Sequence, residues 1–129
     1  MRVLIVDDEP LIRWALAETL EVAGHEVKET GRARDTVDAL AGGYAPDLVL
    51  LDFRLPDSDD LNLLRSIRRL SPASEVVMMT AFGTSGMIAE AEQLGAFCVL
   101  TKPVDMATLP TLVTKARLGR RADSSRTAR

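Results

Sequence analysis

Three aspartates follow two strongly apolar segments, and their position indicates chemistry. Asp7 and Asp8 come directly after the apolar run 3–6, and Asp52 comes directly after the run 48–51. Such runs are typical of strands buried on both faces of a parallel sheet, which binds ligands beyond the carboxyl ends of its strands. If the two strands are neighbours, the three carboxylates meet there and repel one another unless a cation or protons neutralise them. The sequence therefore predicts a site for a hard metal ion, with one carboxylate left for chemistry.

A hydroxyl group and an ammonium group follow two further apolar runs. Thr80 comes directly after the run 76–79, and Lys102 follows the run 97–100. Carboxylates form aspartyl phosphates, and Asp52 has the position of such a nucleophile. Mg²⁺ prefers a few carboxylates together with water and substrate phosphate, while lysine and threonine offer donors to phosphoryl oxygens. Since phosphoryl transfer needs little beyond positioning and charge neutralisation, these residues predict Mg²⁺-dependent phosphoryl transfer to Asp52.

The elements that must position these residues alternate along the chain. Strands are predicted at four apolar runs and at one more polar, alternating segment suited to a sheet edge: 3–6, 26–30, 48–51, 76–79 and 97–100. Helical patterns follow each strand, at 10–23, 32–41, 60–70, 86–94 and roughly 106–117. Because crossovers between parallel strands are right-handed, this order predicts a doubly wound α/β fold with helices on both faces of a parallel sheet.

The last predicted helix contains a proline. Pro110 cannot donate a backbone hydrogen bond, and its ring clashes with the preceding turn of a helix. Two interpretations are open: the helix starts after Asp105 and is distorted, or it starts late, with Thr108 as its cap. The late start is favoured, because proline is tolerated in the first turn.

Length and composition limit the class of protein. The chain has 129 residues, of which 47% are apolar and 27% charged, as expected for one globular domain. The single cysteine, Cys98, lies in an apolar run, which excludes an internal disulfide and indicates a core thiol. Apolar stretches are far shorter than the ~20 residues of a membrane span, and the early first strand leaves no room for a signal peptide. We therefore expect a cytoplasmic protein without a membrane segment.

Charge is distributed unevenly along the chain. The net charge is −3, but residues 117–129 carry five arginines and one aspartate, so that residues 1–116 carry −7. An acidic body argues against direct nucleic-acid contact by this domain. Residues 119–129 contain no apolar side chain larger than alanine, and we interpret them as a flexible basic linker or tail after a domain at 1–118.

Four segments, taken in order, resemble one protein family. They are Val-Asp-Asp-Glu-Pro at 6–10, Leu-Asp-Phe-Arg-Leu-Pro-Asp at 51–57, Met-Thr-Ala-Phe-Gly at 79–83, and Gly-Ala-Phe at 95–97 leading to Thr-Lys-Pro at 101–103. Over about residues 2–118 the chain resembles the receiver domain of bacterial two-component response regulators, most closely the nitrogen-regulatory, enhancer-binding type. The resemblance implies a flavodoxin-like (βα)5 fold with the strand order 2-1-3-4-5, in which the first and third strands are adjacent.

The resemblance also assigns roles to the candidate residues. It implies that Asp52 accepts a phosphoryl group from a histidine of a sensor kinase or of a histidine phosphotransfer protein. Asp8 and Asp52 would bind Mg²⁺ directly and Asp7 through water, with the backbone carbonyl of Arg54 as a further ligand. Self-phosphorylation and autodephosphorylation at Asp52 would both depend on Mg²⁺, so the domain would be a signalling receiver and not a turnover enzyme.

A conformational switch is implied by the same resemblance. Lys102 would pair with the phosphoryl group, Thr80 would move toward it, and the peptide bond between Lys102 and Pro103 would be cis. These movements would remodel the face formed by the last two helices and the strand between them, through which receivers form homodimers. The switch would regulate transcription through an output domain absent from this chain, or act on a partner protein.

Three residues depart from the family pattern. Val99 stands where receivers usually carry an aromatic side chain whose rotation accompanies activation, and Asp60 stands where a glycine usually follows the acidic loop. Pro110 changes the last helix, which is part of the usual dimer surface. Val99 keeps open the alternative of a degenerate receiver that serves as a protein-binding module. Because no DNA-binding or ATPase element follows residue 118, a single-domain receiver that acts by protein contacts stays open as well.

An enzyme of another class provides a third alternative. Aspartyl-phosphate phosphohydrolases of the haloacid-dehalogenase type carry their nucleophile on the first strand, with a second aspartate two residues later. Here the candidate nucleophile, Asp52, follows the third strand along the chain, and the residue two positions later is Arg54. This order disfavours the enzyme.

Trp14 lies off the apolar face of the first predicted helix, beside Leu11 and Glu18. One interpretation is that these residues dock the helical bundle of the kinase, which must approach Asp52 closely. The other is that Trp14 packs against a loop of its own domain.

Overall fold

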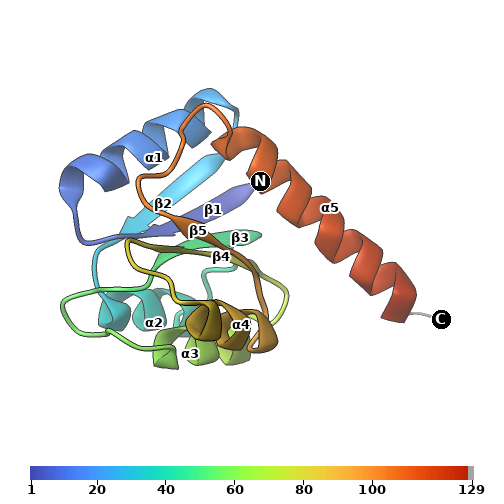
Figure 1. Ribbon diagram of the computed structural model, residues 1–129. Helices are drawn as coiled ribbons and strands as arrows, with labels where there is room; N and C mark the ends of the chain where they lie inside the picture. Colours follow the sequence, from blue (N-terminus) through green and yellow to red (C-terminus); the bar gives the residue numbers. More distant parts are fainter. Residues whose placement is uncertain (128–129) are drawn as a thin grey trace.

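The computed structural model describes residues 1–127, and their side chains as far as residue 119. Five strands alternate with five helices (Figure 1): β1 (Arg2–Val6), α1 (Pro10–Val22), β2 (Glu26–Thr30), α2 (Ala33–Ala41), β3 (Leu48–Asp52), α3 (Asn62–Leu70), β4 (Glu75–Thr80), α4 (Ser85–Gln93), β5 (Ala96–Thr101) and α5 (Leu109–Thr127). Every strand and helix predicted from the sequence is present.

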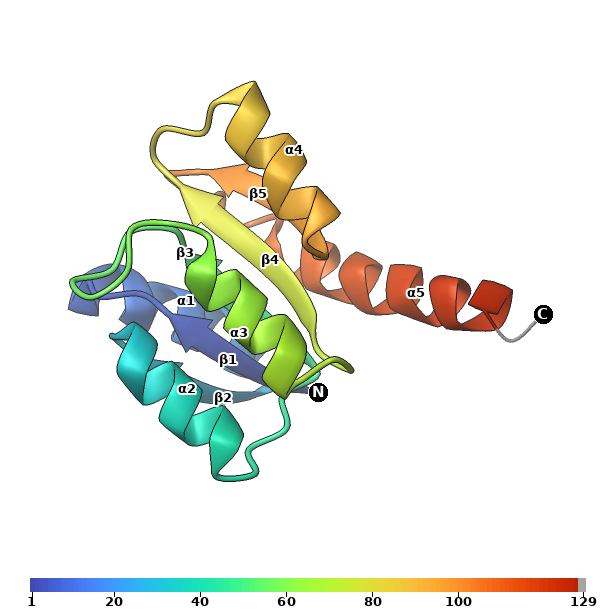
Figure 2. The same ribbon diagram turned by 90° about the horizontal axis from the view of Figure 1, so that it is seen from below.

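All five strands are parallel, in the order β2-β1-β3-β4-β5. Helices α1 and α5 cover one face of the sheet, and α2, α3 and α4 cover the other (Figures 1 and 2). The predicted doubly wound fold is therefore confirmed. The chain winds away from β1 in both directions, so the carboxyl ends of β1 and β3 flank the point where such sheets bind ligands.

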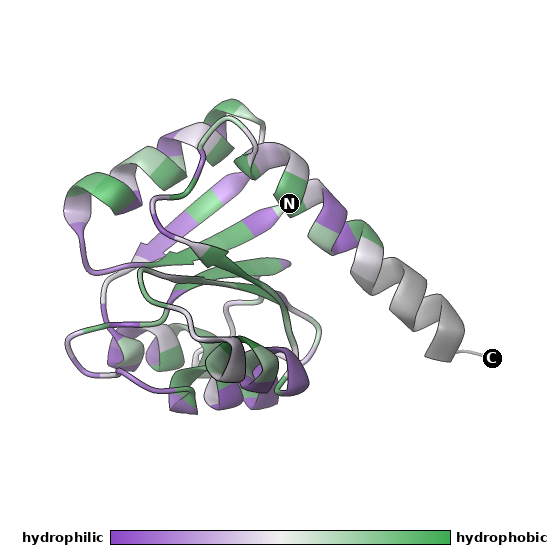
Figure 3. Cartoon of the chain, viewed as in Figure 1, coloured by the Kyte–Doolittle hydropathy of each residue, from purple (hydrophilic) through white to green (hydrophobic). Residues whose placement is uncertain are grey.

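The core consists of two apolar layers, one on each face of the sheet. Side chains alternate along a strand, so Val49 faces the layer beneath α3, whereas Leu50 faces the layer beneath α1. Figure 3 shows apolar central strands between helices that carry both hydrophobic and hydrophilic residues. Burial on both faces explains why β3 is apolar up to Asp52, while the edge strand β2, with its partly exposed side chains, carries charges.

Helix α3 begins two residues later than predicted, and Asp60 supplies the reason. Its carboxylate accepts hydrogen bonds from the backbone nitrogen of Asn62 at 2.8 Å and from the Asn62 side chain at 2.9 Å. An aspartate that accepts from the amide two residues ahead forms an Asx-type turn, which lies outside the helix. The acidic residue at the usual glycine position thus stabilises the first turn of α3.

The late start predicted for the last helix is confirmed. Helix α5 begins at Leu109, which places Pro110 in its first turn. The Thr108 hydroxyl donates to the main-chain oxygen of Asp105 at 3.1 Å, whereas a capping hydroxyl accepts from a backbone nitrogen of the first turn, so the role of Thr108 as the cap stays a prediction.

The predicted end of this helix near residue 117 is wrong, because α5 continues to Thr127. The added segment contains no proline, and Leu118, Ala122 and its three arginines favour a helix, whereas its glycine and two serines do not. The division into a domain at 1–118 and a linker at 119–129 stays a prediction, and its last two residues, 128–129, lie outside the described part of the chain. Within residues 1–127, no helix has both the length and the apolar character needed to cross a membrane.

Candidate functional site

The three aspartates predicted to converge do meet at the carboxyl edge of the sheet. β1 pairs with β3 as far as Val6 and Leu51, so Asp7 follows β1 beside Asp52, the last residue of β3. One carboxylate oxygen from each of Asp7, Asp8 and Asp52 lies within 4.8 Å of the other two. Asp7 is fully buried and Asp52 nearly so, whereas Asp8 is exposed. The expected convergence is confirmed.

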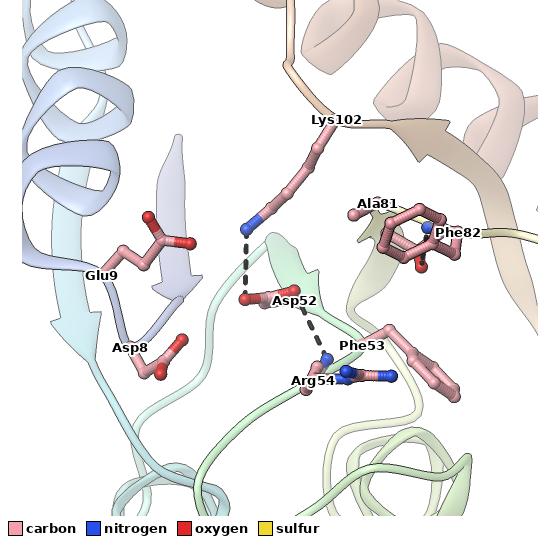
Figure 4. A pocket seen from close by; sticks show the side chains of 9 residues that line it. Asp8, Glu9, Asp52, Phe53, Arg54, Ala81, Phe82 and Lys102 are labelled. Atoms are coloured by element: carbon pink, nitrogen blue, oxygen red, sulfur yellow. Dashed lines mark hydrogen bonds and ion pairs between the residues drawn. The ribbon is translucent and has the colours of Figure 1, made fainter.

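Lys102 joins two of these carboxylates. Its Nζ donates to Oδ2 of Asp7 at 2.9 Å and to Oδ2 of Asp52 at 3.1 Å, and its side chain is 13% exposed. Figure 4 shows the lysine reaching from the end of β5 to Asp52. The peptide bond between Lys102 and Pro103 is cis, as expected. The sequence resemblance predicted a contact between this lysine and a phosphoryl group, and the ammonium lies where such a group on Asp52 would be within its reach.

Thr80 ends β4 beside the same cavity. The cavity, of about 240 Å³, is lined by Asp8, Glu9, Asp52, Phe53, Arg54, Thr80, Ala81, Phe82 and Lys102 (Figure 4). The Thr80 hydroxyl accepts a hydrogen bond from the backbone nitrogen of Phe82 at 3.3 Å, and the main-chain oxygen of Thr80 accepts one from the backbone nitrogen of Lys102 at 2.8 Å. The structure thus brings Thr80, Asp52 and Lys102 to one cavity.

The electrostatics of the site favour a cation. Burial raises the pKa of Asp52, and the charge of Asp7 raises it further, while Lys102 partly offsets both effects. Burial alone would lower the pKa of Lys102, but its hydrogen bond to Asp7 and the charge and hydrogen bond of Asp52 raise it. Three carboxylates and one ammonium leave an excess of two negative charges when all are ionised. That excess matches a divalent cation.

The residues present fit Mg²⁺. Asp7, Asp8 and Asp52 offer only hard oxygen donors, grouped closely enough to share one ion. Arg54 lines the cavity, and its backbone nitrogen donates to Oδ1 of Asp52 at 3.4 Å. The assignment of its carbonyl as a further ligand stays a prediction.

Asp57 contributes an interaction that the sequence analysis missed. Its carboxylate, in the loop between β3 and α3, accepts hydrogen bonds from the backbone nitrogens of Ala33 at 2.8 Å and Arg34 at 3.0 Å. These bonds lower the pKa of Asp57, that from Ala33 having the largest effect. Arg32, at the cap position of α2, provides no side-chain hydrogen bond of its own. A residue of the loop after Asp52 therefore caps a helix distant in sequence, which no local pattern could indicate.

Trp14 is 62% exposed and Leu11 is 83% exposed, both on the outer side of α1. Trp14 borders a surface groove with Glu18, Val22 and Pro110. This exposure argues against tight packing of Trp14 against a loop of its own domain, and docking of the kinase by α1 stays a prediction.

Val99 leaves no aromatic ring at the usual switch position. It is half-buried in β5 and packs against the core layer beneath α3 and α4, whereas Phe97 packs against the opposite layer. Phe82 is 85% exposed at the mouth of the cavity. Neither phenylalanine occupies the place of the missing ring.

Comparisons with known proteins agree with this geometry. Residues 3–114 match the family model described as response regulator receiver domain. The chain is 42% identical over 117 residues to the response regulator protein PilR of Pseudomonas aeruginosa, covering 89% of this chain and 26% of PilR. It is 37% identical over 114 residues to the DNA-binding transcriptional regulator NtrC of Escherichia coli, covering 88% of this chain and 24% of NtrC. The chain thus spans about a quarter of the length of these relatives.

A shorter relative is covered almost completely. The chain is 32% identical over 114 residues to the sporulation initiation phosphotransferase F of Bacillus subtilis, covering 88% of this chain and 91% of the relative. Among solved structures, a CheY-like response regulator receiver domain protein from Methanospirillum hungatei superimposes with a TM-score of 0.87 at 25% identity, covering 95% of this chain and 97% of that structure.

Proposed function

Because the chain belongs to the response regulator receiver domain family, we propose that it accepts a phosphoryl group on Asp52 and changes the conformation of its output face in response. Phosphoryl transfer to an aspartate is general in this family. The observation that supports Asp52 as the acceptor is its position: Lys102 binds its carboxylate at 3.1 Å, and Asp7 and Asp8 lie beside it.

The transfer step uses the nucleophilic oxygen of Asp52. This oxygen attacks the phosphorus of a phosphohistidine on a sensor kinase or histidine phosphotransfer protein. The bond between phosphorus and the imidazole nitrogen breaks, its electron pair stays on the nitrogen, and an aspartyl phosphate forms. Asp8 and Asp52, with the Arg54 carbonyl and with Asp7 through water, would hold Mg²⁺, which would supply charge neutralisation at the phosphoryl oxygens. Lys102 binds one phosphoryl oxygen and so stabilises the same charge.

The switch follows from the change in charge. A phosphoryl group brings about −1.5 to −2 charges at neutral pH. Lys102 and the Thr80 hydroxyl turn toward it, and the loops after β4 and β5 move with them. A nearly complete switch needs a preference of roughly 10⁴ for one conformation, about 5.5 kcal/mol. The remodelled surface comprises α4, β5 and α5, which we propose as the homodimer interface.

The partners follow from the family and from the length of the match. Receiver domains interact with histidine kinases and with output domains. Because the chain spans about a quarter of PilR and NtrC, we propose that it regulates transcription in the cytoplasm through an output domain, without touching DNA itself. The nearly full coverage of phosphotransferase F favours a second candidate, a single-domain receiver that acts by protein contacts.

An intact-mass experiment tests the phosphoacceptor. The native chain is incubated with acetyl phosphate and Mg²⁺, beside Asp52→Asn and the matched control Asp59→Asn, an exposed carboxylate outside the site. We expect one phosphoryl adduct on the native chain and on Asp59→Asn, and none on Asp52→Asn. An adduct that persists in Asp52→Asn would refute the assignment, and absence of any adduct on the native chain would favour the degenerate receiver.

A further inference from the structure

Arg13 binds, from outside the cavity, the turn after β1 that carries Asp7 and Asp8. Its Nη1 donates to the main-chain oxygen of Asp7 at 2.7 Å, and its Nε donates to Oε1 of Glu29 in β2 at 3.2 Å. The guanidinium lies against Gly31, where an added Cβ would be 3.0 Å from Nη1 and 3.7 Å from the Asp7 oxygen. The guanidinium of Arg13 therefore joins α1, β2 and the turn after β1, and it occupies space that the missing side chain of Gly31 leaves open.

The peptide group that Arg13 binds leads directly into Asp8. Among the described side chains, the carboxylates of Asp7 and Asp52 bind Lys102, whereas that of Asp8 makes no hydrogen bond or ion pair. No described side chain therefore holds the Asp8 carboxylate, and its place depends on the position of its backbone, which fixes the point from which the side chain projects. That backbone is fixed at Asp7 by the bond from Arg13 and by a bond from the Asp7 nitrogen to the Thr30 oxygen at 3.1 Å.

We propose that Arg13 is a positioning residue for the cation site: it orients the peptide between Asp7 and Asp8 so that the Asp8 carboxylate faces that of Asp52. This inference rests on the proposed function, because it assumes that the three carboxylates bind Mg²⁺. Arg13 is 25% exposed at its side chain and does not line the cavity, so its effect on the ion is indirect.

Charge and positioning predict opposite results for the loss of Arg13. Removing a positive charge near the carboxylates would, by Coulomb attraction alone, strengthen the binding of a divalent cation. Removing a group that orients a ligand weakens metal binding, typically by about 10- to 100-fold. The sign of the change therefore distinguishes the two roles.

Calorimetric titration of the metal-free chain with Mg²⁺ at pH 7 provides the test. We expect Arg13→Met to weaken Mg²⁺ binding by about tenfold or more. The control Arg65→Met removes an arginine that pairs with Glu90 between α3 and α4, and it should change the affinity by less than about twofold.

The outcomes separate this inference from the proposed function. A folded Arg13→Met that binds Mg²⁺ as tightly as the native chain, or more tightly, overturns the inference alone. A native chain that binds no Mg²⁺ overturns the inference together with the proposed site. If Arg13→Met shows no cooperative unfolding transition, Arg13→Lys replaces it in the titration. Its ammonium keeps the positive charge but cannot reproduce the two hydrogen bonds of the planar guanidinium. Unchanged Mg²⁺ affinity of Arg13→Lys then overturns the inference, and weaker Mg²⁺ binding supports it.

Discussion

Replacing Lys102 with methionine should destabilise the protein strongly at neutral pH. Methionine keeps an unbranched side chain of similar length but removes the ammonium group. That ammonium binds Asp7 at 2.9 Å and Asp52 at 3.1 Å, and the two carboxylates are 0% and 7% exposed at their side chains. The variant would leave both of them buried without the cation that they share, beside the carboxylate of Asp8.

The expected magnitude is about 3 kcal/mol. Removing one partner of a buried ion pair typically costs about 3–5 kcal/mol, because the other charge stays buried. Two like charges 4 Å apart repel by about 4 kcal/mol at an effective dielectric constant of 20. Asp52 limits this cost by taking up a proton, since burial already raises its pKa. A loss of about 3 kcal/mol would be a large part of the ~5–15 kcal/mol that stabilises a typical domain.

The pH dependence has a definite sign. The pKa of Lys102 is raised in the folded protein, so its contribution is complete below the unfolded value of about 10.4 and is lost as the pH rises through the folded value. In Lys102→Met, the pKa of Asp52 rises further, so the folded state binds more protons than the unfolded state. The stability of the variant therefore falls as the pH rises from about 3.9 through that raised value.

Urea unfolding followed by circular dichroism measures this effect, at pH 7 and near pH 4. Mg²⁺ at about 100 times its dissociation constant should add about 2.7 kcal/mol to the native chain. It should restore at least as much to Lys102→Met, where a cation replaces the missing ammonium. Two results would refute the stated role of the ion pairs. One is that the unfolding free energies of the native chain and Lys102→Met differ by less than about 1 kcal/mol at pH 7. The other is that Lys102→Met loses the same stability at pH 7 and near pH 4.

Two further variants test features outside the cavity. Asp57→Ala removes the cap of α2 and should lower the unfolding free energy by about 1 kcal/mol in urea at pH 7. This loss should fade as the pH falls from about 3.9 through the lowered pKa of Asp57. Equal stability of Asp57→Ala and the control Asp59→Ala at pH 7 would contradict the prediction. Trp14→Ala should slow transfer from the cognate kinase by about 30-fold or more, the loss typical of an interface hot spot, while labelling by acetyl phosphate stays unchanged. Equal transfer rates for Trp14→Ala and the native chain would dispose of docking by α1.

Most of the fold is visible in the sequence because burial dictates composition. A strand covered on both faces must be apolar throughout, so 3–6 and 48–51 are recognisable, and the polar residue that ends each run marks the sheet edge. Helix starts are predictable where one residue type has a strong positional preference, as with Pro110. The continuation of α5 beyond residue 117 was not predicted, because only weak propensities, and no single residue, favour a helix there.

The interactions that shape the site are less predictable, because they join distant segments. Lys102 and Asp7 are 95 positions apart, and their contact depends on the strand order, which only the resemblance implied. The two bonds of Asp57 to α2 and the bond of Arg13 to the Asp7 oxygen involve main-chain atoms, which every residue possesses. No pattern of side-chain types in the sequence can indicate them.

On the proposed function, phosphorylation changes the partners of Lys102 and not only the charge of the site. Once Asp52 becomes a mixed anhydride, its carboxylate charge is gone and the negative charge lies on the phosphoryl oxygens, so the ammonium must follow it outward. The backbone nitrogen of Lys102 donates to the Thr80 oxygen at 2.8 Å, and Thr80 pairs with Thr101 across β4 and β5. A shift of the lysine therefore pulls on the end of β4 through the main chain. Since Val99 provides no ring to rotate, we propose that this main-chain link, together with the movement of the Thr80 hydroxyl, connects the site to the face formed by α4, β5 and α5.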